Sequence, residues 1–181
     1  MLRASHRQIG IYLAQNHLKQ ANSVQQNAFL WGCEQPDRNP LTYLKGSVKC
    51  RLLHGHNYPN AAAYMSRLSR RLEGKKHWGL LDYYSLGKLI HYITDAFTYS
   101  HNEGFPSNLV LHRKYEASLQ QCFLAYLKQP SIQIREDLSV FDTITCFHRE
   151  YRSHPPAVHH DIHYAINACC SVIAVLTGRQ N

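Results

Sequence analysis

Hydrophobic residues along this chain recur mainly at intervals of three and four, the spacing that places side chains on one face of an α-helix. No stretch of useful length alternates hydrophobic and polar residues, as a half-buried β-strand would. We therefore predict an all-α protein that forms a single domain over residues 1–181. It should contain six or seven helices, over residues 6–18, 23–31, 59–73, 78–100, 108–128, 136–151 and 157–178.

Residues with known effects on helix ends set several of these boundaries. Ser5 is a suitable N-cap for the first helix, Gly32 is expected to end the second, and Pro59 suits the first turn of the third. Residues 33–47 are rich in proline, aspartate and asparagine, which predicts an irregular loop that contains Asp37. The last predicted helix is hydrophobic along most of its length, so we expect it in the core.

Histidine is the unusual feature of the composition, with 13 residues in a chain of 181. Because a buried imidazole without a partner is unfavourable, this excess favours metal binding by some of the histidines. The chain has 20 Lys and Arg residues against 12 Asp and Glu, a formal net charge of +8. This balance favours anionic partners such as phosphodiesters, nucleic acid or anionic lipid surfaces, although a charge that serves only solubility would look the same.

The sequence also bears on location. Its first residues have no continuous hydrophobic segment followed by a small-residue cleavage site, so no signal peptide is visible. The most hydrophobic run, residues 168–176, is about half of the ~20 residues that span a bilayer, so we expect no transmembrane segment. The six cysteines form no C-x-x-C pair and no regular framework. These features together predict a soluble cytoplasmic protein with reduced cysteines.

The strongest chemical signal lies between residues 86 and 116. It reads H-x3-D-x5-H and then H-x3-E, formed by His91, Asp95, His101, His112 and Glu116. Members of a pair four residues apart stack on one face of a helix, close enough to share a metal ion. His101 lies six residues after Asp95, roughly 120° round a regular helix, which suits a second metal better than the first. Imidazole and carboxylate groups are ligands of zinc and similar ions.

Other histidines leave alternatives open. His54 and His56 flank a glycine just before the third helix. One of them could be a metal ligand held in place by the start of that helix, or both could be ordinary loop residues. His159, His160 and His163 form a competing cluster in the last helix. Its neighbouring acid, Asp161, points to another face of that helix, so we expect this cluster to bind no metal.

The order of these residues resembles that of the zinc-dependent phospholipase C family of bacteria, whose helical fold is shared with the single-strand-specific zinc nucleases. Members of the family have a helical H-x3-D-x5-H followed by H-x3-E or H-x3-D. Upstream they have a histidine at the start of the first helix, an aspartate in an early loop and a histidine before a helix. The matching residues here are His6, Asp37 and His56, with His54 as the rival of His56.

The resemblance implies two or three zinc ions per chain. The first ion would be bound by Asp37, His56, His91 and Asp95, and Asp95 would bridge to a third ion that also binds His6. The second ion would be bound by His101, His112 and Glu116. In the family, the third ion is completed by the free α-amine and carbonyl of an N-terminal tryptophan. This chain has Met1 there, five residues before His6, and we hypothesise that its α-amine takes the same role.

The resemblance further implies hydrolysis of a phosphate ester by zinc-activated water, with Asp37 as the residue that orients or deprotonates the water. The substrate would be a phospholipid or a soluble phosphoester. A zinc-dependent nuclease is the alternative enzyme, and it would need aromatic side chains near the site to stack bases. A helical protein with a purely structural metal is the alternative outside catalysis. The sequence does not indicate an oligomeric state.

Overall fold

The computed structural model describes residues 1–39, 57–102, 104–106 and 108–178, so His54 and His56 lie outside the described residues. Within those ranges the protein is all-α and has no strand, which confirms the predicted fold class. The elements are α1 (Arg3–His17), α2 (Ser23–Arg38), α3 (Tyr58–Glu73), α4 (Leu80–Ala96), the 3-10 turn η2 (Tyr99–His101), α5 (Leu109–Tyr126), α6 (Val140–Arg152) and α7 (Val158–Gly178).

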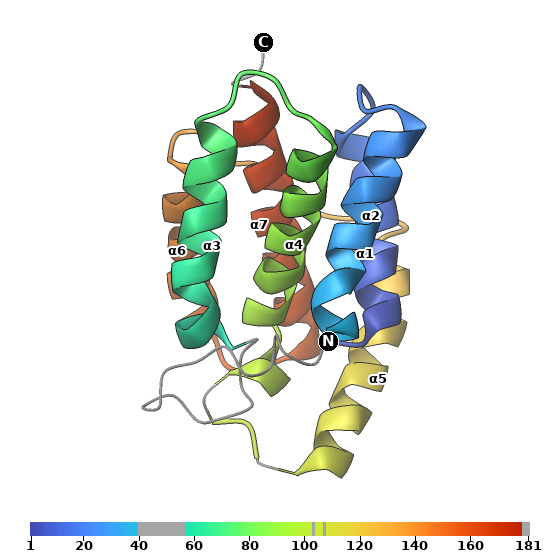
Figure 1. Ribbon diagram of the computed structural model, residues 1–181. Coiled ribbons are helices and arrows are strands. Elements are labelled where there is room, and N and C mark those ends of the chain that lie inside the picture. The colour runs from blue at the N-terminus through green and yellow to red at the C-terminus, as the bar shows by residue number, and fades with distance from the viewer. Residues whose placement is uncertain (40–56, 103, 107, 179–181) are drawn as a thin grey trace.

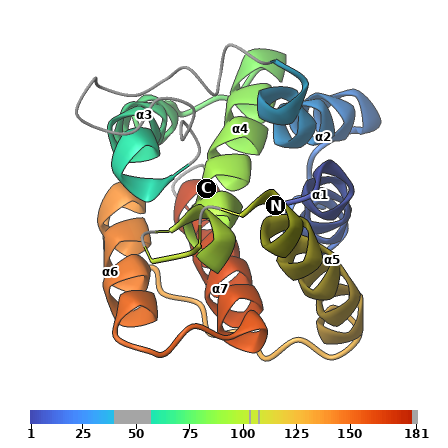
Figure 2. The same ribbon diagram turned by 90° about the horizontal axis from the view of Figure 1, so that it is seen from below.

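The helices stand side by side, with α4 in contact with α1, α2, α3 and α7 (Figure 1). Viewed from below, α4 and α7 lie between α3 and α6 on one side and α1, α2 and α5 on the other (Figure 2). Several helix ends meet at this lower end of the molecule: the starts of α1, α5 and α7, the ends of α2 and α4, and η2. Side chains from segments far apart in the sequence therefore converge there.

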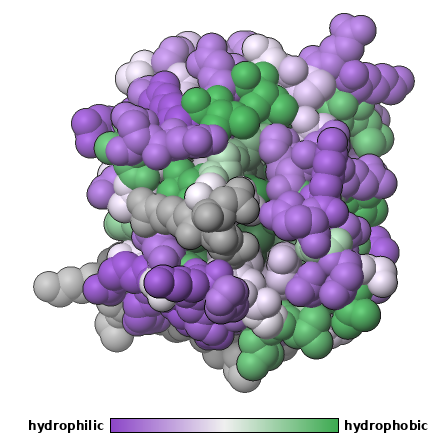
Figure 3. Space-filling view, turned by 90° about the horizontal axis from the view of Figure 1, so that it is seen from above, coloured by the Kyte–Doolittle hydropathy of each residue, from purple (hydrophilic) through white to green (hydrophobic). Residues whose placement is uncertain are grey.

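The core is built on α4 and α7, which are hydrophobic on nearly all sides. Leu86, Ile90 and Ile93 of α4 and Ile166 and Val172 of α7 are at most 1% exposed. Of the helices in the described ranges, α7 is the one long and apolar enough to cross a membrane, but 72% of that window is buried inside the molecule. Such burial is what a core helix shows. The upper end of the molecule is mostly hydrophilic, with smaller hydrophobic areas between (Figure 3).

The second helix does not end at Gly32, as the sequence suggested, but continues to Arg38. Gly32 instead allows α2 to lie against α4: a Cβ atom there would be 2.2 Å from the carbonyl oxygen of Tyr84, and one at Gly87 would be 2.1 Å from that of Phe29. Tertiary packing thus outweighs the usual helix-breaking effect of glycine. As a consequence, Asp37 lies in the last turn of a helix rather than in a loop.

Other boundaries also differ from expectation, among them the start of α6 at Val140 in place of residue 136 and two boundaries close to the candidate site. The helix predicted to reach residue 100 ends at Ala96, because the side-chain amide of Asn102 donates to the carbonyl oxygens of Ala96 (2.9 Å) and Thr98 (2.8 Å). His101 is therefore carried by η2 and not by α4. Ser5 is not the N-cap of α1 but a buried residue in its first turn, since α1 begins at Arg3.

Candidate metal centre

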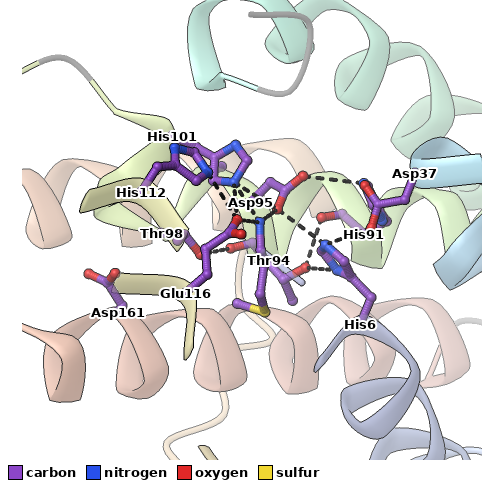
Figure 4. A network of polar contacts seen from close by, with 12 residues as sticks. His6, Asp37, His91, Thr94, Asp95, Thr98, His101, His112, Glu116 and Asp161 are labelled. Atoms are coloured by element: carbon purple, nitrogen blue, oxygen red, sulfur yellow. Dashed lines mark hydrogen bonds and ion pairs between the residues drawn. The ribbon is translucent and has the colours of Figure 1, made fainter. Parts of the chain in front are cut away.

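The first cluster of candidate ligands joins α1, α2 and α4 around the carboxylate of Asp95 (Figure 4). Asp95 Oδ1 lies 3.2 Å from His6 Nε2, and Asp95 Oδ2 lies 3.2 Å from His91 Nε2. Asp37, at the end of α2, faces the same two nitrogens at 3.8 Å from His6 and 3.7 Å from His91. The two imidazole rings stack with centroids 3.8 Å apart. Each carboxylate thus has one oxygen toward each histidine.

The hydrogen bonds behind these rings determine which nitrogen each histidine presents. His91 Nδ1 lies 2.8 Å from the carbonyl oxygen of Cys33, which can only accept, so Nδ1 has the proton. The Thr94 hydroxyl donates to the His91 carbonyl at 2.8 Å and must therefore accept from His6 Nδ1, at 2.9 Å. In its neutral form each of these histidines therefore presents an unprotonated Nε2 toward Asp95. Metal-binding histidines commonly use their second nitrogen in this way.

The second cluster consists of His101 from η2 and His112 and Glu116 from α5. Glu116 Oε1 lies 3.1 Å from His112 Nε2 and 3.3 Å from His101 Nε2. His112 and Glu116 lie one turn apart on α5, as their spacing predicted. The rings of His101 and His112 meet edge to face with centroids 5.2 Å apart. Three potential ligands thus converge from two separate segments.

The α-amine of Met1 lies between the two clusters. It donates to Asp95 Oδ1 at 2.8 Å, lies 2.9 Å from Glu116 Oε1, and also contacts His101 Nε2. The Met1 side chain is 1% exposed, so the start of the chain is buried in the site. His101 Nε2 is also 3.7 Å from Asp95 Oδ1. His101 therefore does not point away from the first cluster, as an uninterrupted helix would require, but lies beside both clusters.

The electrostatics of the site favour the neutral form of His6 and the ionised forms of Asp95 and Glu116. Burial, and next the proximity of the His91 ring, lower the pKa of His6 to about 4. Burial alone would raise the pKa of Asp95, but the Met1 ammonium group and nearby histidines hold it well below its usual range. Burial likewise opposes ionisation of Glu116, whose pKa is nevertheless lowered by hydrogen bonds from His101 and His112. Neutral imidazole and ionised carboxylate are the forms that bind metal ions.

The structure brings together seven of the eight sequence-predicted ligands: His6, Asp37, His91, Asp95, His101, His112 and Glu116. The eighth, His56, lies outside the described residues. His159, His160 and His163 belong to no metal-type group in the described part of the chain. Sequence reasoning missed Thr94 and the Cys33 carbonyl. A hydroxyl three residues after His91 in a hydrophobic helix was the only signal for Thr94, and a backbone carbonyl leaves no signal in the sequence.

The donor set fits zinc. Both clusters combine imidazole nitrogens with carboxylate oxygens, and His6 Nε2 is buried without a hydrogen bond although a carboxylate oxygen is near.

Fold and site together define a helical protein with a candidate multinuclear metal centre at one end. The chain belongs to the zinc-dependent phospholipase C family, whose sequence model matches residues 5–164. Membership supports a zinc-dependent hydrolase that acts on a phosphate ester or lipid. Searches of curated proteins and of solved structures found no match.

Proposed function

We propose that this protein is a phospholipase C-like phosphodiesterase that holds two or three zinc ions in the two clusters. The observation that supports this most strongly is the arrangement of Asp95. One of its oxygens faces His6 and the other faces His91, each at 3.2 Å, as a carboxylate that bridges two metal ions would require. A structural zinc site, in contrast, normally uses four ligands around one ion.

In this proposal His91, Asp37 and Asp95 hold one ion, and His56 is the further ligand that the family resemblance implies. His6 and the second oxygen of Asp95 hold another ion, with the Met1 amine as the hypothesised additional ligand. His101, His112 and Glu116 hold the remaining one. Zinc bound in such a site lowers the pKa of water toward ~7 and stabilises charge on phosphoryl oxygens.

Asp37 is the proposed catalytic residue. It lies farther from His6 and His91 than Asp95 does, and its side chain is 12% exposed against 1% for Asp95. Asp37 is therefore the carboxylate of the first cluster that is nearer to solvent. From that position its carboxylate is able to orient an incoming water molecule and accept its proton.

The substrate class proposed is a phosphodiester of the phospholipid type. The net charge of +8 favours an anionic substrate but does not separate lipid from nucleic acid. A nuclease would need aromatic faces free for base stacking. Tyr92 is buried, Tyr58 stacks on His148, and Tyr99 and Phe105 pack against each other. These four rings serve packing, and the family match favours a phospholipid.

Metal stoichiometry tests the proposal most directly. Elemental analysis of the purified protein should find two or three zinc ions per chain. Asp95→Ala should lose most of this zinc, because it removes the carboxylate shared by His6 and His91. Asp137→Ala is the matched control, since Asp137 is an exposed acid outside the site, and it should retain all of it. Less than one ion per chain, unchanged in Asp95→Ala, would contradict the metal centre.

The substrate is tested on the same proteins. We expect hydrolysis of a phosphatidylcholine-type lipid that Asp37→Asn reduces by about two orders of magnitude or more, the usual range for a general base. Asp37→Asn should keep more zinc than Asp95→Ala. Cleavage of single-stranded DNA in place of lipid would favour the nuclease. Full zinc content with neither activity would favour a structural metal.

A further inference from the structure

Asp161 is a buried acid in the first turn of α7 that belongs to neither cluster. Its side chain accepts three hydrogen bonds, each 2.8 Å long. Oδ2 accepts from the backbone N–H of Tyr99 and from the hydroxyl of Tyr115, and Oδ1 accepts from the hydroxyl of Tyr151. Figure 4 shows Asp161 apart from the contacts that join the candidate ligands.

The two donors that share Oδ2 come from the two segments that form the second cluster. Tyr99 begins η2, the turn that ends at His101. Tyr115 directly precedes Glu116 on α5 and lies three residues after His112. One carboxylate oxygen of α7 therefore ties together two segments that the chain itself connects through a loop.

The helix α5 buries few of its side chains. Among its described side chains only Glu116, Leu119 and Phe123 are buried. The rings of Tyr99, Tyr115 and Phe105 pack against one another at centroid distances of 5.3 to 5.9 Å. The start of α5 is thus held by the hydrogen bond from Tyr115 to Asp161, by this small aromatic group, and by the contacts of Glu116 with Met1 and His101.

We infer that Asp161 is a positioning residue for the second cluster: by binding Tyr99 and Tyr115 at one oxygen, it sets the distance between His101 and the pair His112/Glu116. The inference rests on the proposed function, because it requires these three residues to be metal ligands.

The third hydrogen bond supplies an internal control. Tyr151 lies on α6, which contains none of the candidate ligands. If Asp161 only stabilises the fold, loss of any one of its three hydrogen bonds should have a similar effect. If it positions the second cluster, zinc binding should depend on the bonds from Tyr99 and Tyr115 and not on the bond from Tyr151. Asn keeps one carbonyl oxygen that is able to accept from both Tyr99 and Tyr115, and its amide group then lies opposite the hydroxyl of Tyr151. Asn is therefore the conservative replacement at this position.

The test measures Zn²⁺ binding to metal-free protein, resolved into successive equivalents by competition with a chelating dye. Asp161→Ala should weaken one equivalent by about tenfold to a hundredfold, the usual effect of losing a residue that orients a metal ligand. Tyr115→Phe should weaken the same equivalent. Tyr151→Phe and Asp161→Asn should bind as the wild type does. His112→Ala shows which zinc equivalent binds at the second cluster. The double variant with His112→Ala and Asp161→Ala should bind zinc as His112→Ala alone does, because the affected ligand set is already lost.

The outcomes separate this inference from the proposed function. If the wild type binds two or three Zn²⁺ ions and Asp161→Ala keeps every equivalent while its melting temperature falls, Asp161 is only structural and the inference is wrong. Equal effects of Tyr151→Phe and Tyr115→Phe on the one equivalent would also contradict it. If the wild type binds less than one Zn²⁺ ion, the proposed function fails first and the inference with it. If Asp161→Ala does not fold, the comparison of zinc affinity between Tyr115→Phe and Tyr151→Phe decides the question by itself.

Discussion

At the scale of single residues, the chemistry of the site depends on which ring nitrogen each histidine presents. Thr94 controls this for His6, because its hydroxyl proton is used by the His91 carbonyl and its oxygen is left to accept from His6 Nδ1. The Cys33 carbonyl does the same for His91. Groups that never touch a metal ion thus decide whether the two histidines are able to bind one.

Thr94→Val should therefore weaken zinc binding without removing a ligand. Valine has the same shape but no acceptor, so His6 Nδ1–H would be buried without a partner. We expect zinc affinity to fall by about tenfold to a hundredfold and the free energy of unfolding to fall by about 1–3 kcal/mol. Calorimetric titration and urea unfolding measure the two effects. Thr94→Ser keeps the hydroxyl and should bind zinc nearly as the wild type does; equal losses in both variants would refute this role of the hydroxyl.

His148 gives a prediction on pH. It is 8% exposed and stacked on Tyr58, and burial, followed by the charge of Arg152, lowers its pKa to about 4 from 6.5. The unfolded chain takes up this proton below pH 6.5 and the folded protein only near 4, so stability is lost as the pH falls between these values. The loss reaches about 1.4 kcal/mol per pH unit.

His148→Phe should remove this part of the acid sensitivity. Phenylalanine keeps the stacking on Tyr58 and removes Nε2, which is buried without a hydrogen bond. In the presence of a chelator, urea unfolding at neutral pH and at a pH of about 5 should show a smaller loss for the variant than for the wild type. Parallel curves for the two proteins would mean that His148 does not titrate in this way.

At the scale of elements, the close packing of α2 on α4 positions the first cluster. Gly87 lies one turn before His91, and α2 supplies both Asp37 and the Cys33 carbonyl. The three atoms nearest to a Cβ at Gly87 would all be backbone atoms of α2, at 2.1 to 2.9 Å, and backbone cannot move aside as a flexible side chain does. The two helices would have to separate.

Gly87→Ala should therefore lower the free energy of unfolding by about 1–3 kcal/mol or more and reduce zinc affinity as well. Gly178→Ala is the control, because Gly178 is also helical and a Cβ there has nothing within 4 Å. That control should be neutral or slightly stabilising, since alanine is the better helix former. Thermal unfolding and zinc titration measure both effects, and a Gly87→Ala protein as stable as the control would disprove the close contact.

At the scale of the whole molecule, the site exists because helix ends from distant parts of the chain meet at one end of the bundle (Figure 1). The Met1 amine comes from far away in the sequence, 94 residues before Asp95. In space it lies 2.8 Å from Asp95 and 2.9 Å from Glu116. Burial would lower the pKa of this amine, but the two carboxylates outweigh it and raise the pKa. The ammonium group thus compensates the charge of both clusters.

A tag joined ahead of Met1 should consequently be harmful. It converts the buried amine into an amide and so removes its charge. The added residues would also have to pass between Asp95 and Glu116, where the amine now lies. We expect a lower melting temperature for the metal-free protein and less zinc per chain, whereas the same tag placed after Asn181 should leave both unchanged. Nα-acetylation should act like the N-terminal tag. Identical zinc content in the two tagged proteins would show that the Met1 amine has no role in metal binding.

Local sequence determined the parts of this protein that depend on short-range geometry. Hydrophobic periodicity predicted the all-α fold, because an amphipathic helix must bury its hydrophobic face. Spacing predicted the pairs His91/Asp95 and His112/Glu116, because residues four apart on a helix are neighbours whatever the rest of the chain does. The link from these pairs to His6 and Asp37 came from the family resemblance and not from periodicity.

Only the tertiary structure decided the rest. Gly32 and Pro36 look like helix breakers, but contact with α4 keeps α2 helical to Arg38 and puts Asp37 in a helix. His101 reaches both clusters because Asn102 ends α4 early. The roles of three further groups depend on partners that are distant in the sequence. Thr94 bonds to His6, 88 residues away, and the Cys33 carbonyl bonds to His91, 58 residues away. Asp161 bonds to Tyr99 and Tyr115, which are 62 and 46 residues away. Such contacts depend on how the helices pack, which no local pattern in the sequence expresses.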